Sequence, residues 1–265
     1  MAKPLTYGSY LRVDELLALQ SPRSRGDDEK PEHDELLFIV IHQVYELWFH
    51  QILHELDFVQ TLLRAGDSAR AGHTLRRILT ILKTIVSQID VLETMTPLEF
   101  ASFRSFLDSA SGFQSAQFRE IEFALGRKRE AMLRHFAPEP AAVERLTRRY
   151  HTPTLWDAFL HYLHQAGYAI PADQLQRDVT QSLLPNEAVQ AVLIEVYRTN
   201  PALRAICERL VDLDEGFQEW RYRHLKMVER TIGARPGTGG SPGAAYLATT
   251  MQALFPDLWV IRSML

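Results

Sequence analysis

The residue most suited to acid or base chemistry is His42, which lies on the same helical face as Phe38, Tyr45 and Phe49. An imidazole between aromatic rings can act as an acid, a base or an orienting group in an apolar pocket. The simpler alternative is a core histidine whose ring is hydrogen-bonded to the backbone. The sequence leaves both interpretations open.

A second histidine, His224, shares a helix side with Phe217, Trp220, Met227 and Val228. A lone imidazole in apolar surroundings is what a proximal haem ligand requires, because the porphyrin must be packed and kept dry. The alternative is a structural histidine. The neighbouring Arg221 and Arg223 could bind haem propionates or could be solvated at the surface.

Arg104 lies among Phe100, Phe103 and Phe106. An arginine in such surroundings can pair with a carboxylate through two parallel hydrogen bonds. It could also extend past the aromatic rings to the surface. The sequence therefore predicts a buried arginine that pairs with a protein or substrate carboxylate, with a surface arginine as the alternative.

The glycine-rich segment 234–243 has no Lys-Ser or Lys-Thr after its last glycine, which disfavours a nucleotide phosphate loop. It can instead bring backbone N–H groups and the Thr238 hydroxyl close to a small ligand. A passive linker between two helices is the alternative.

Two other constellations are weaker. Glu46, His50 and His54 are four residues apart, which could hold a metal, but we expect a solvated or interfacial face. No Glu-x-x-His pair occurs, which argues against a carboxylate di-iron bundle. Cys207 is the only cysteine, so it forms no disulfide within the chain, and we expect it in the core and not as a haem thiolate.

Composition limits the classes of protein to consider. The 265 residues are 46% hydrophobic, enough for a large core, and we expect one domain spanning residues 1–265. The formal net charge is -4 and the basic residues are dispersed, which argues against a nucleic-acid partner. The start of the chain has no signal-peptide pattern, and Leu36 to Ile41 is the longest aliphatic or aromatic run, so we expect a soluble cytoplasmic protein with no membrane span.

Apolar residues recur at three- and four-residue steps over 34–63, 68–94 and 201–232, which predicts three long helices. Asn200 is a plausible N-cap, Pro201 fits the first helical position and Gly233 fits the end. Shorter helices are predicted over 97–107, 115–126, 140–148, 153–166, 186–198 and 243–253, and loops over 21–32 and 235–243. No strand-like alternation with hairpin signals occurs, so the predicted fold is all-α.

Several motifs in one order resemble the tryptophan 2,3-dioxygenase family from about residue 5 to the end. They are Leu5 to Leu11, His33 to Trp48, Ser111 to Ser115, Phe217 to His224 and Gly237 to Gly240. This resemblance implies a helical homotetramer that binds haem b and uses O2. It also implies the reaction, which adds both oxygen atoms across the indole C2–C3 bond of L-tryptophan to give N-formylkynurenine.

The resemblance also implies roles for individual residues. His224 would be the axial ligand of the haem iron, in a pocket that includes Trp220, Ser111 and Gly112, and His42 would meet the indole N–H. Arg104 would pair with the substrate carboxylate, Thr238 would hold the amino-acid end of the substrate, and Phe38 would pack on the indole. Tyr7 and Tyr10, in an N-terminal segment over residues 1–20, would close the site of a neighbouring subunit.

The sequence departs from the family pattern at several positions. Phe100 and Phe118 replace tyrosines, Ile89 replaces a common tryptophan, and Val44-Tyr45 replaces two small polar residues. Ala234-Arg235-Pro236 also stands where Phe-Lys-Arg is usual. An alternative is therefore a biosynthetic haem monooxygenase or peroxygenase acting on a modified tryptophan or a tyrosine-like substrate. A non-catalytic haem- or tryptophan-binding protein is less favoured, because His42 and Arg104 are retained.

Overall fold

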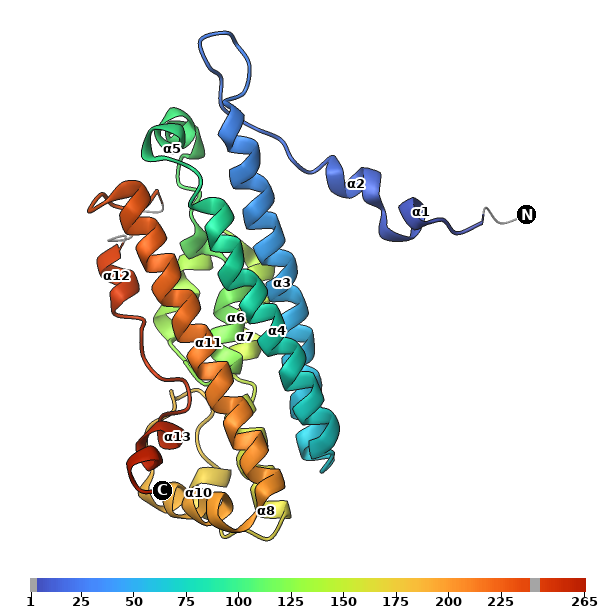
Figure 1. Cartoon of the computed structure of the whole chain (residues 1–265), viewed down its shortest axis with the longest axis vertical. Helices are drawn as coiled ribbons and strands as arrows, with labels where there is room; N and C mark the ends of the chain where they lie inside the picture. The colour runs from blue at the N-terminus through green and yellow to red at the C-terminus, as the bar shows by residue number, and fades with distance from the viewer. Residues whose placement is uncertain (1–3, 239–243) are drawn as a thin grey trace.

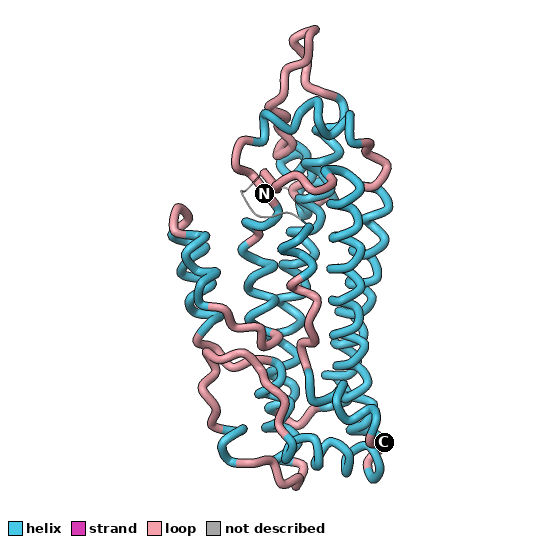
Figure 2. The backbone as a smooth tube through the Cα atoms, turned by 90° about the vertical axis from the view of Figure 1, so that its left-hand side faces the viewer, coloured by secondary structure: helices cyan, strands magenta, loops and turns pink. Residues whose placement is uncertain are grey.

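The computed structural model describes residues 4–238 and 244–265, and these residues form helices and loops with no strand (Figure 2). The three longest helices of this part, α3 (His33–Arg64), α4 (Ser68–Leu92) and α11 (Pro201–Ile232), run side by side along the molecule (Figure 1). Helix α4 packs against both α3 and α11. The all-α prediction is confirmed, and the three long helices match their predicted ranges to within two residues.

Shorter helices close the bundle. Helix α5 (Pro97–Arg104) lies at one end, whereas α10, α13 and the C-terminus lie at the other (Figure 1). Helices α6 and α8 pack against α3. The remaining bounds are η1 (Ser105–Leu107), η2 (Gly112–Gln114), α6 (Ala116–Ala124), η3 (Glu130–Phe136), α7 (Pro140–Tyr150), α8 (Leu155–Gln165), α9 (Ala172–Leu175), α10 (Glu187–Thr199), α12 (Ala244–Ala248), α13 (Pro256–Val260) and η4 (Ile261–Ser263).

The ends of the helices that carry the candidate residues follow from local chemistry. The Asn200 side chain accepts a hydrogen bond from Leu203 N, Pro201 occupies the first position of α11, and Gly233 ends the helix at φ 61°. Thr96 and Glu99 form a reciprocal capping box at the start of α5. These signals fix where His224 and Arg104 fall along their helices.

Two contacts fasten α11 to its surroundings. Gly216 faces α4 so closely that an added Cβ would lie 3.2 Å from Cδ1 of Leu82. The fully buried carboxylate of Asp214 accepts hydrogen bonds from the backbone N–H groups of Leu254 and Phe255, at 2.8 and 2.9 Å, and from Trp259 Nε1 at 2.9 Å. Asp214 thereby holds the C-terminal segment against α11.

One predicted helix, over 243–253, was wrong in extent, because α12 ends at Ala248. Beyond that residue, the hydroxyls of Thr249 and Thr250 donate to the carbonyls of Tyr246 and Leu247, a local pattern that competes with helix continuation. The helices α1, α2, α9 and α13 were not predicted, since each is too short to show a period. The predicted glycine-rich loop is described only as far as Thr238, and Gly239 to Gly243 lie outside the described residues.

An N-terminal arm, α1 (Tyr7–Leu11) and α2 (Val13–Leu17), extends away from the helical body (Figure 1). Neither helix contains a buried residue. The chain rejoins the body at Leu19 and Gln20, which hydrogen-bond with Gln43 of α3. It is held again where the buried carboxylate of Glu35 accepts hydrogen bonds from the backbone N–H groups of Arg23 and Ser24. The arm therefore offers its apolar side chains outward.

Helix α3 is long and apolar enough, by length and composition alone, to cross a membrane. However, it packs against α4, α6 and α8 and buries the polar side chains of Glu35, Glu55 and Gln60. Those contacts are typical of a core helix in a helical bundle.

Candidate active site

A cavity of about 230 Å³ opens between α3, α5, α6 and α11. The structure brings nine of the predicted site residues together in its wall: Phe38, His42, Phe100, Arg104, Ser111, Gly112, Trp220, His224 and Thr238. Residues from separate parts of the chain therefore meet around one cavity.

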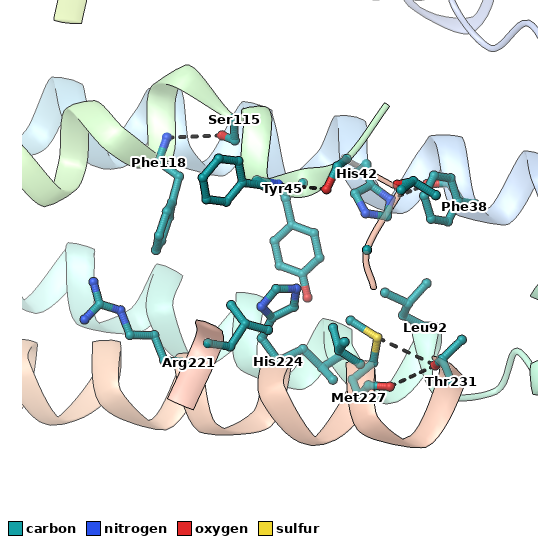
Figure 3. A pocket seen from close by; sticks show the side chains of 18 of the residues that line it. Phe38, His42, Tyr45, Leu92, Ser115, Phe118, Arg221, His224, Met227 and Thr231 are labelled. Atoms are coloured by element: carbon teal, nitrogen blue, oxygen red, sulfur yellow. Dashed lines mark hydrogen bonds between the residues drawn. The ribbon is translucent and has the colours of Figure 1, made fainter. Parts of the chain in front are cut away.

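His42 reaches the cavity from α3 (Figure 3). Its Nδ1 lies 2.7 Å from the carbonyl oxygen of Phe38, which can only accept, so Nδ1 carries the proton and Nε2 keeps a free lone pair. Burial is the main effect on this side chain, and it lowers the pKa of His42 below the usual histidine value. His42 is thus both hydrogen-bonded to the backbone and available as a neutral acceptor.

His224 reaches the same cavity from α11 (Figure 3). Its ring stacks on Trp220, with centroids 5.1 Å apart and planes 12° apart. Burial, with a smaller contribution from His42, lowers the pKa of His224 to about 4, so the imidazole is neutral. Within the described residues neither ring nitrogen has a hydrogen-bond partner. A neutral nitrogen aimed into an apolar cavity is a suitable ligand for a metal.

Arg104 lies at the mouth of the cavity, at the end of α5. Its Nη2 donates to the carbonyl oxygen of Pro236 at 2.7 Å, and the Thr238 hydroxyl donates to the carbonyl of Ala110 nearby. The expectation of a buried Arg104 was wrong: the side chain is half-buried, because α5 ends there and the mouth is open to solvent. Its other guanidinium nitrogens are free for a ligand among the described residues.

A cluster that sequence analysis missed lies in the cavity wall around Glu122, which is 2% exposed. Its carboxylate accepts hydrogen bonds from Arg119 at 2.5 Å, Arg221 at 2.7 Å and Arg129 at 3.2 Å. Although burial opposes ionisation, Arg119 and Arg221 hold the pKa of Glu122 below its usual value. Three guanidinium groups around one carboxylate leave a net charge of +2.

The three arginines retain unused hydrogen-bond donors. The Nε atoms of Arg119, Arg129 and Arg221 are buried and have no partner. Burial, followed by repulsion from Arg221, also lowers the pKa of the nearby Arg127 to about 10. Excess positive charge and unsatisfied buried donors both indicate that this part of the wall is built for an anion.

Arg221 and Arg223, which could each bind a propionate or be solvated, have different surroundings in the structure. Arg221 is 4% exposed and faces the cavity. Arg223 instead forms an ion pair with Asp90 at 2.6 Å and a longer one with Glu93 at 3.5 Å, outside the cavity. The one sequence signal for this difference is spacing. Arg221 precedes His224 by three residues and therefore lies on the same helix face as His224.

The Glu46, His50 and His54 set does not behave as one face. Glu46 lines the cavity and accepts a hydrogen bond from Gln117 at 2.8 Å, whereas both histidines are exposed. Glu55 is buried and pairs with Arg77 at 2.9 Å. Within residues 4–238 and 244–265, no three His, Cys, Asp or Glu side chains are grouped to hold a metal ion. The expected solvated face is thus present at His50 and His54, while Glu46 is partly buried at the edge of the cavity.

Four of the departures from the family pattern lie in the cavity wall, whereas Val44 and Ala234-Arg235-Pro236 do not line it. Phe100, Phe118, Ile89 and Tyr45 all line it. Phe100 packs against Phe38 and Phe103, with ring centroids 5.9 and 5.4 Å apart. Phe118 packs against Trp220 at 4.8 Å. These substitutions therefore change surfaces that a bound molecule would meet.

Tyr7 and Tyr10 do not reach the cavity of their own chain. They are 79% and 70% exposed on the N-terminal arm.

The donor set of the cavity fits an iron porphyrin. The wall supplies an unpartnered neutral imidazole at His224, a largely apolar lining, and the cationic side chains of Arg119 and Arg221, which would attract anionic substituents. Each of these features is a recognised requirement for holding haem.

Comparison with known proteins agrees with this site. The sequence profile of the tryptophan 2,3-dioxygenase family matches residues 1–167 and 169–265. The chain is 68% identical to the tryptophan 2,3-dioxygenase of Herpetosiphon aurantiacus, covering 99% of each chain, and 55% identical to that of Anaeromyxobacter sp. strain K, covering 98% of this chain and 96% of the relative. It is also 42% identical to that of Caulobacter vibrioides over the full length of both. The chain belongs to the tryptophan 2,3-dioxygenase family.

Proposed function

We propose that this chain is a haem-dependent dioxygenase that converts L-tryptophan and O2 into N-formylkynurenine, with both oxygen atoms added across the indole C2–C3 bond. The observation that carries the proposal is the pairing of two neutral histidines in one cavity. His224 has a free ligand nitrogen, and His42 has a free acceptor nitrogen. Full-length relatives named tryptophan 2,3-dioxygenase support the same reaction.

The cofactor assigned to the cavity is haem b. His224 would ligate the iron, Trp220 would pack beside the ligand, and Ser111 and Gly112 would line the haem pocket. The excess positive charge of the arginines around Glu122 would attract the propionates of haem b, with Arg119 and Arg221 in the cavity wall. When bound, ferrous haem supplies the activation of O2.

The remaining task of the protein is to bind and orient the substrate. The Nε2 lone pair of neutral His42 would accept the indole N–H, and the rings of Phe38 and Phe100 would pack on the indole. Arg104 would pair with the substrate carboxylate, and Thr238 would hold the amino-acid end. These contacts keep the indole C2–C3 bond in one orientation and exclude water from it.

We also propose a single haem-binding domain over residues 1–265 that assembles as a cytoplasmic homotetramer. Supporting observations are the outward arm and the exposed apolar side chains on α3, of which Leu36 is 48% and Leu47 is 54% exposed. In that assembly, residues 1–20 contact a neighbouring subunit, where Tyr7 and Tyr10 would complete the site, and residues 234–243 form the active-site loop.

The test is a product assay on the ferrous, haem-loaded protein with L-tryptophan under isotopically labelled O2. We expect N-formylkynurenine that carries two labelled oxygen atoms. One labelled atom, or turnover only with peroxide, would favour the monooxygenase or peroxygenase alternative, which Phe100 and Phe118 in the cavity wall keep relevant. No turnover of any aromatic amino acid would contradict an enzymatic role.

Haem ligation is tested separately. His224→Ala should abolish or strongly shift the haem absorption band of the purified protein, whereas His50→Ala, at an exposed position on α3, should leave the band unchanged. An unchanged band in His224→Ala would refute the assigned iron ligand.

A further inference from the structure

His224 lacks one interaction that an iron-bound histidine normally has. An imidazole that binds a metal through one nitrogen almost always donates its other N–H to an acceptor, which fixes the tautomer and the ring orientation. In the described part of the chain, no hydrogen bond to either nitrogen of His224 is present. The acceptor must therefore come from a group that lies near the ring without yet bonding to it.

Tyr45 is the side chain placed for this. Its ring extends from α3 into the cavity that His224 also lines, and in Figure 3 its hydroxyl points toward the side of the cavity from which His224 enters. The two residues also share a neighbour, because Trp220 stacks on His224 and meets the Tyr45 ring edge-on at 6.3 Å and 72°.

The hydroxyl of Tyr45 is already committed as a donor. It donates to the carbonyl oxygen of Ile85 at 2.9 Å, so its proton points toward α4 and its two lone pairs are left to accept. Trp220, whose Nε1 has no hydrogen-bond partner among the described residues, lies close enough to this oxygen to occupy one of them. Burial raises the pKa of Tyr45 well above its usual value, which keeps the phenol neutral. A neutral oxygen with a free lone pair and a fixed proton can only accept from His224.

The ring of Tyr45 also explains two departures from the family pattern together. Ile89 lies one helical turn after Ile85, the residue whose carbonyl Tyr45 bonds, and Ile89 and Tyr45 line the same cavity. The sequence has isoleucine at 89 where the larger tryptophan is common, and tyrosine at 45 where a small polar residue is common. Because both residues line the cavity, the Tyr45 ring would take up space that a tryptophan at position 89 would otherwise use.

We propose that Tyr45 is the positioning residue for His224: its hydroxyl accepts the Nδ1–H of His224 and leaves Nε2 free for iron. The inference rests on the proposed function, because it takes His224 as the iron ligand. The acceptor is neutral, so it orients the imidazole without giving it the strong anionic character that a carboxylate partner would.

The test compares wild type with Tyr45→Phe, which removes only the hydroxyl, and with Tyr197→Phe, a buried tyrosine on α10 far from the cavity, as the matched control. Loss of the acceptor should lower the iron–histidine stretching frequency of the ferrous protein in resonance Raman spectra and raise its reduction potential. It should also weaken haem binding, measured by titrating the haem-free protein with haemin, by about tenfold, the lower end for an outer-shell partner. Tyr197→Phe should change none of these.

Identical spectra, potential and haem affinity in Tyr45→Phe and wild type would overturn the proposal. That outcome is distinct from failure of the proposed function, which would appear as unaltered iron ligation in His224→Ala. If His224→Ala loses the ligand while Tyr45→Phe matches wild type, only the role of Tyr45 is refuted.

A second pair of variants tests the shared volume in the haem-free protein. Ile89→Trp alone should overpack against Tyr45, and Tyr45→Ser alone should leave a cavity, so each should lower the melting temperature. The double variant should melt higher than the sum of the two shifts predicts. Strict additivity would show that the two side chains do not share space and would overturn that part of the inference.

Discussion

Arg104 gives the sharpest test of how the substrate is held. In Arg104→Met the side chain keeps much of its length but loses every N–H donor. The guanidinium is half-buried at the mouth of the cavity, and one of its nitrogens already donates to Pro236 at 2.7 Å, so its other nitrogens would meet the substrate carboxylate. Hydrogen bonds between charged groups contribute about 1.5–3 kcal/mol, and solvent at the open mouth favours the lower value.

A loss of about 1.5 kcal/mol corresponds to about a tenfold weaker interaction. We therefore expect Arg104→Met to raise the dissociation constant of L-tryptophan about tenfold, measured by spectroscopic titration of the haem-loaded protein. Haem content should not change, because Arg104 lies apart from His224 and the arginines around Glu122.

L-Tryptophanamide, which lacks the carboxylate, makes the test specific. Wild type should prefer L-tryptophan to the amide, and Arg104→Met should lose that preference. Arg104→Lys, which keeps the charge but not the paired donors, should be intermediate. If Arg104→Met retains the full preference for the free acid, Arg104 does not bind the carboxylate and the substrate orientation derived from it is incorrect.

Four further expectations concern other parts of the chain. Phe100→Tyr should improve turnover of L-tryptophan if Phe100 reflects a missing hydroxyl donor to the carboxylate, and steady-state kinetics with no gain would end that explanation. Burial lowers the pKa of His42, and protonation would remove the Nε2 lone pair that accepts the indole N–H. As the pH is lowered, kcat/KM should therefore fall only below the usual histidine pKa. A fall centred at or above the usual histidine pKa would contradict a neutral His42. Deleting residues 1–10 should reduce activity more than haem loading, and equal losses would argue against an arm that completes a neighbour's site. Asp214→Ala removes the acceptor of two buried backbone N–H groups and of the partly exposed Trp259 indole, and should reduce the free energy of unfolding by about 3–5 kcal/mol in denaturant titrations. A loss under about 1 kcal/mol would show that the C-terminal segment is held by other contacts.

Much of the fold follows from the sequence because its long helices carry strong signals. Helix α11 begins and ends at the residues that Asn200, Pro201 and Gly233 indicate. The short helices could not be predicted, since four or five residues do not show a period. The early end of α12 depends on the hydroxyl contacts of Thr249 and Thr250, which compete with the helix only in a particular local geometry.

Some residues of the candidate site could likewise be predicted from the sequence, and others could not. His42 and His224 could be selected because their aromatic neighbours recur at helical spacing within one segment. The cluster around Glu122 could not, because Arg119, Arg129 and Arg221 come from three separate segments and meet only in the folded chain. The exposure of Arg104 depends on where α5 stops relative to the cavity mouth, which no local pattern reports.

The close approach of Gly216 to Leu82 has a consequence for the chemistry two turns further along α11. At about 1.5 Å per residue, His224 lies about 12 Å beyond Gly216 on the same rigid rod. A methyl group at position 216 would favour the helix by up to about 1 kcal/mol, yet it would act as a wedge 3.2 Å from Leu82 Cδ1. Gly216 thus sets the distance between α11 and α4. That distance in turn fixes where the imidazole of His224 enters the cavity.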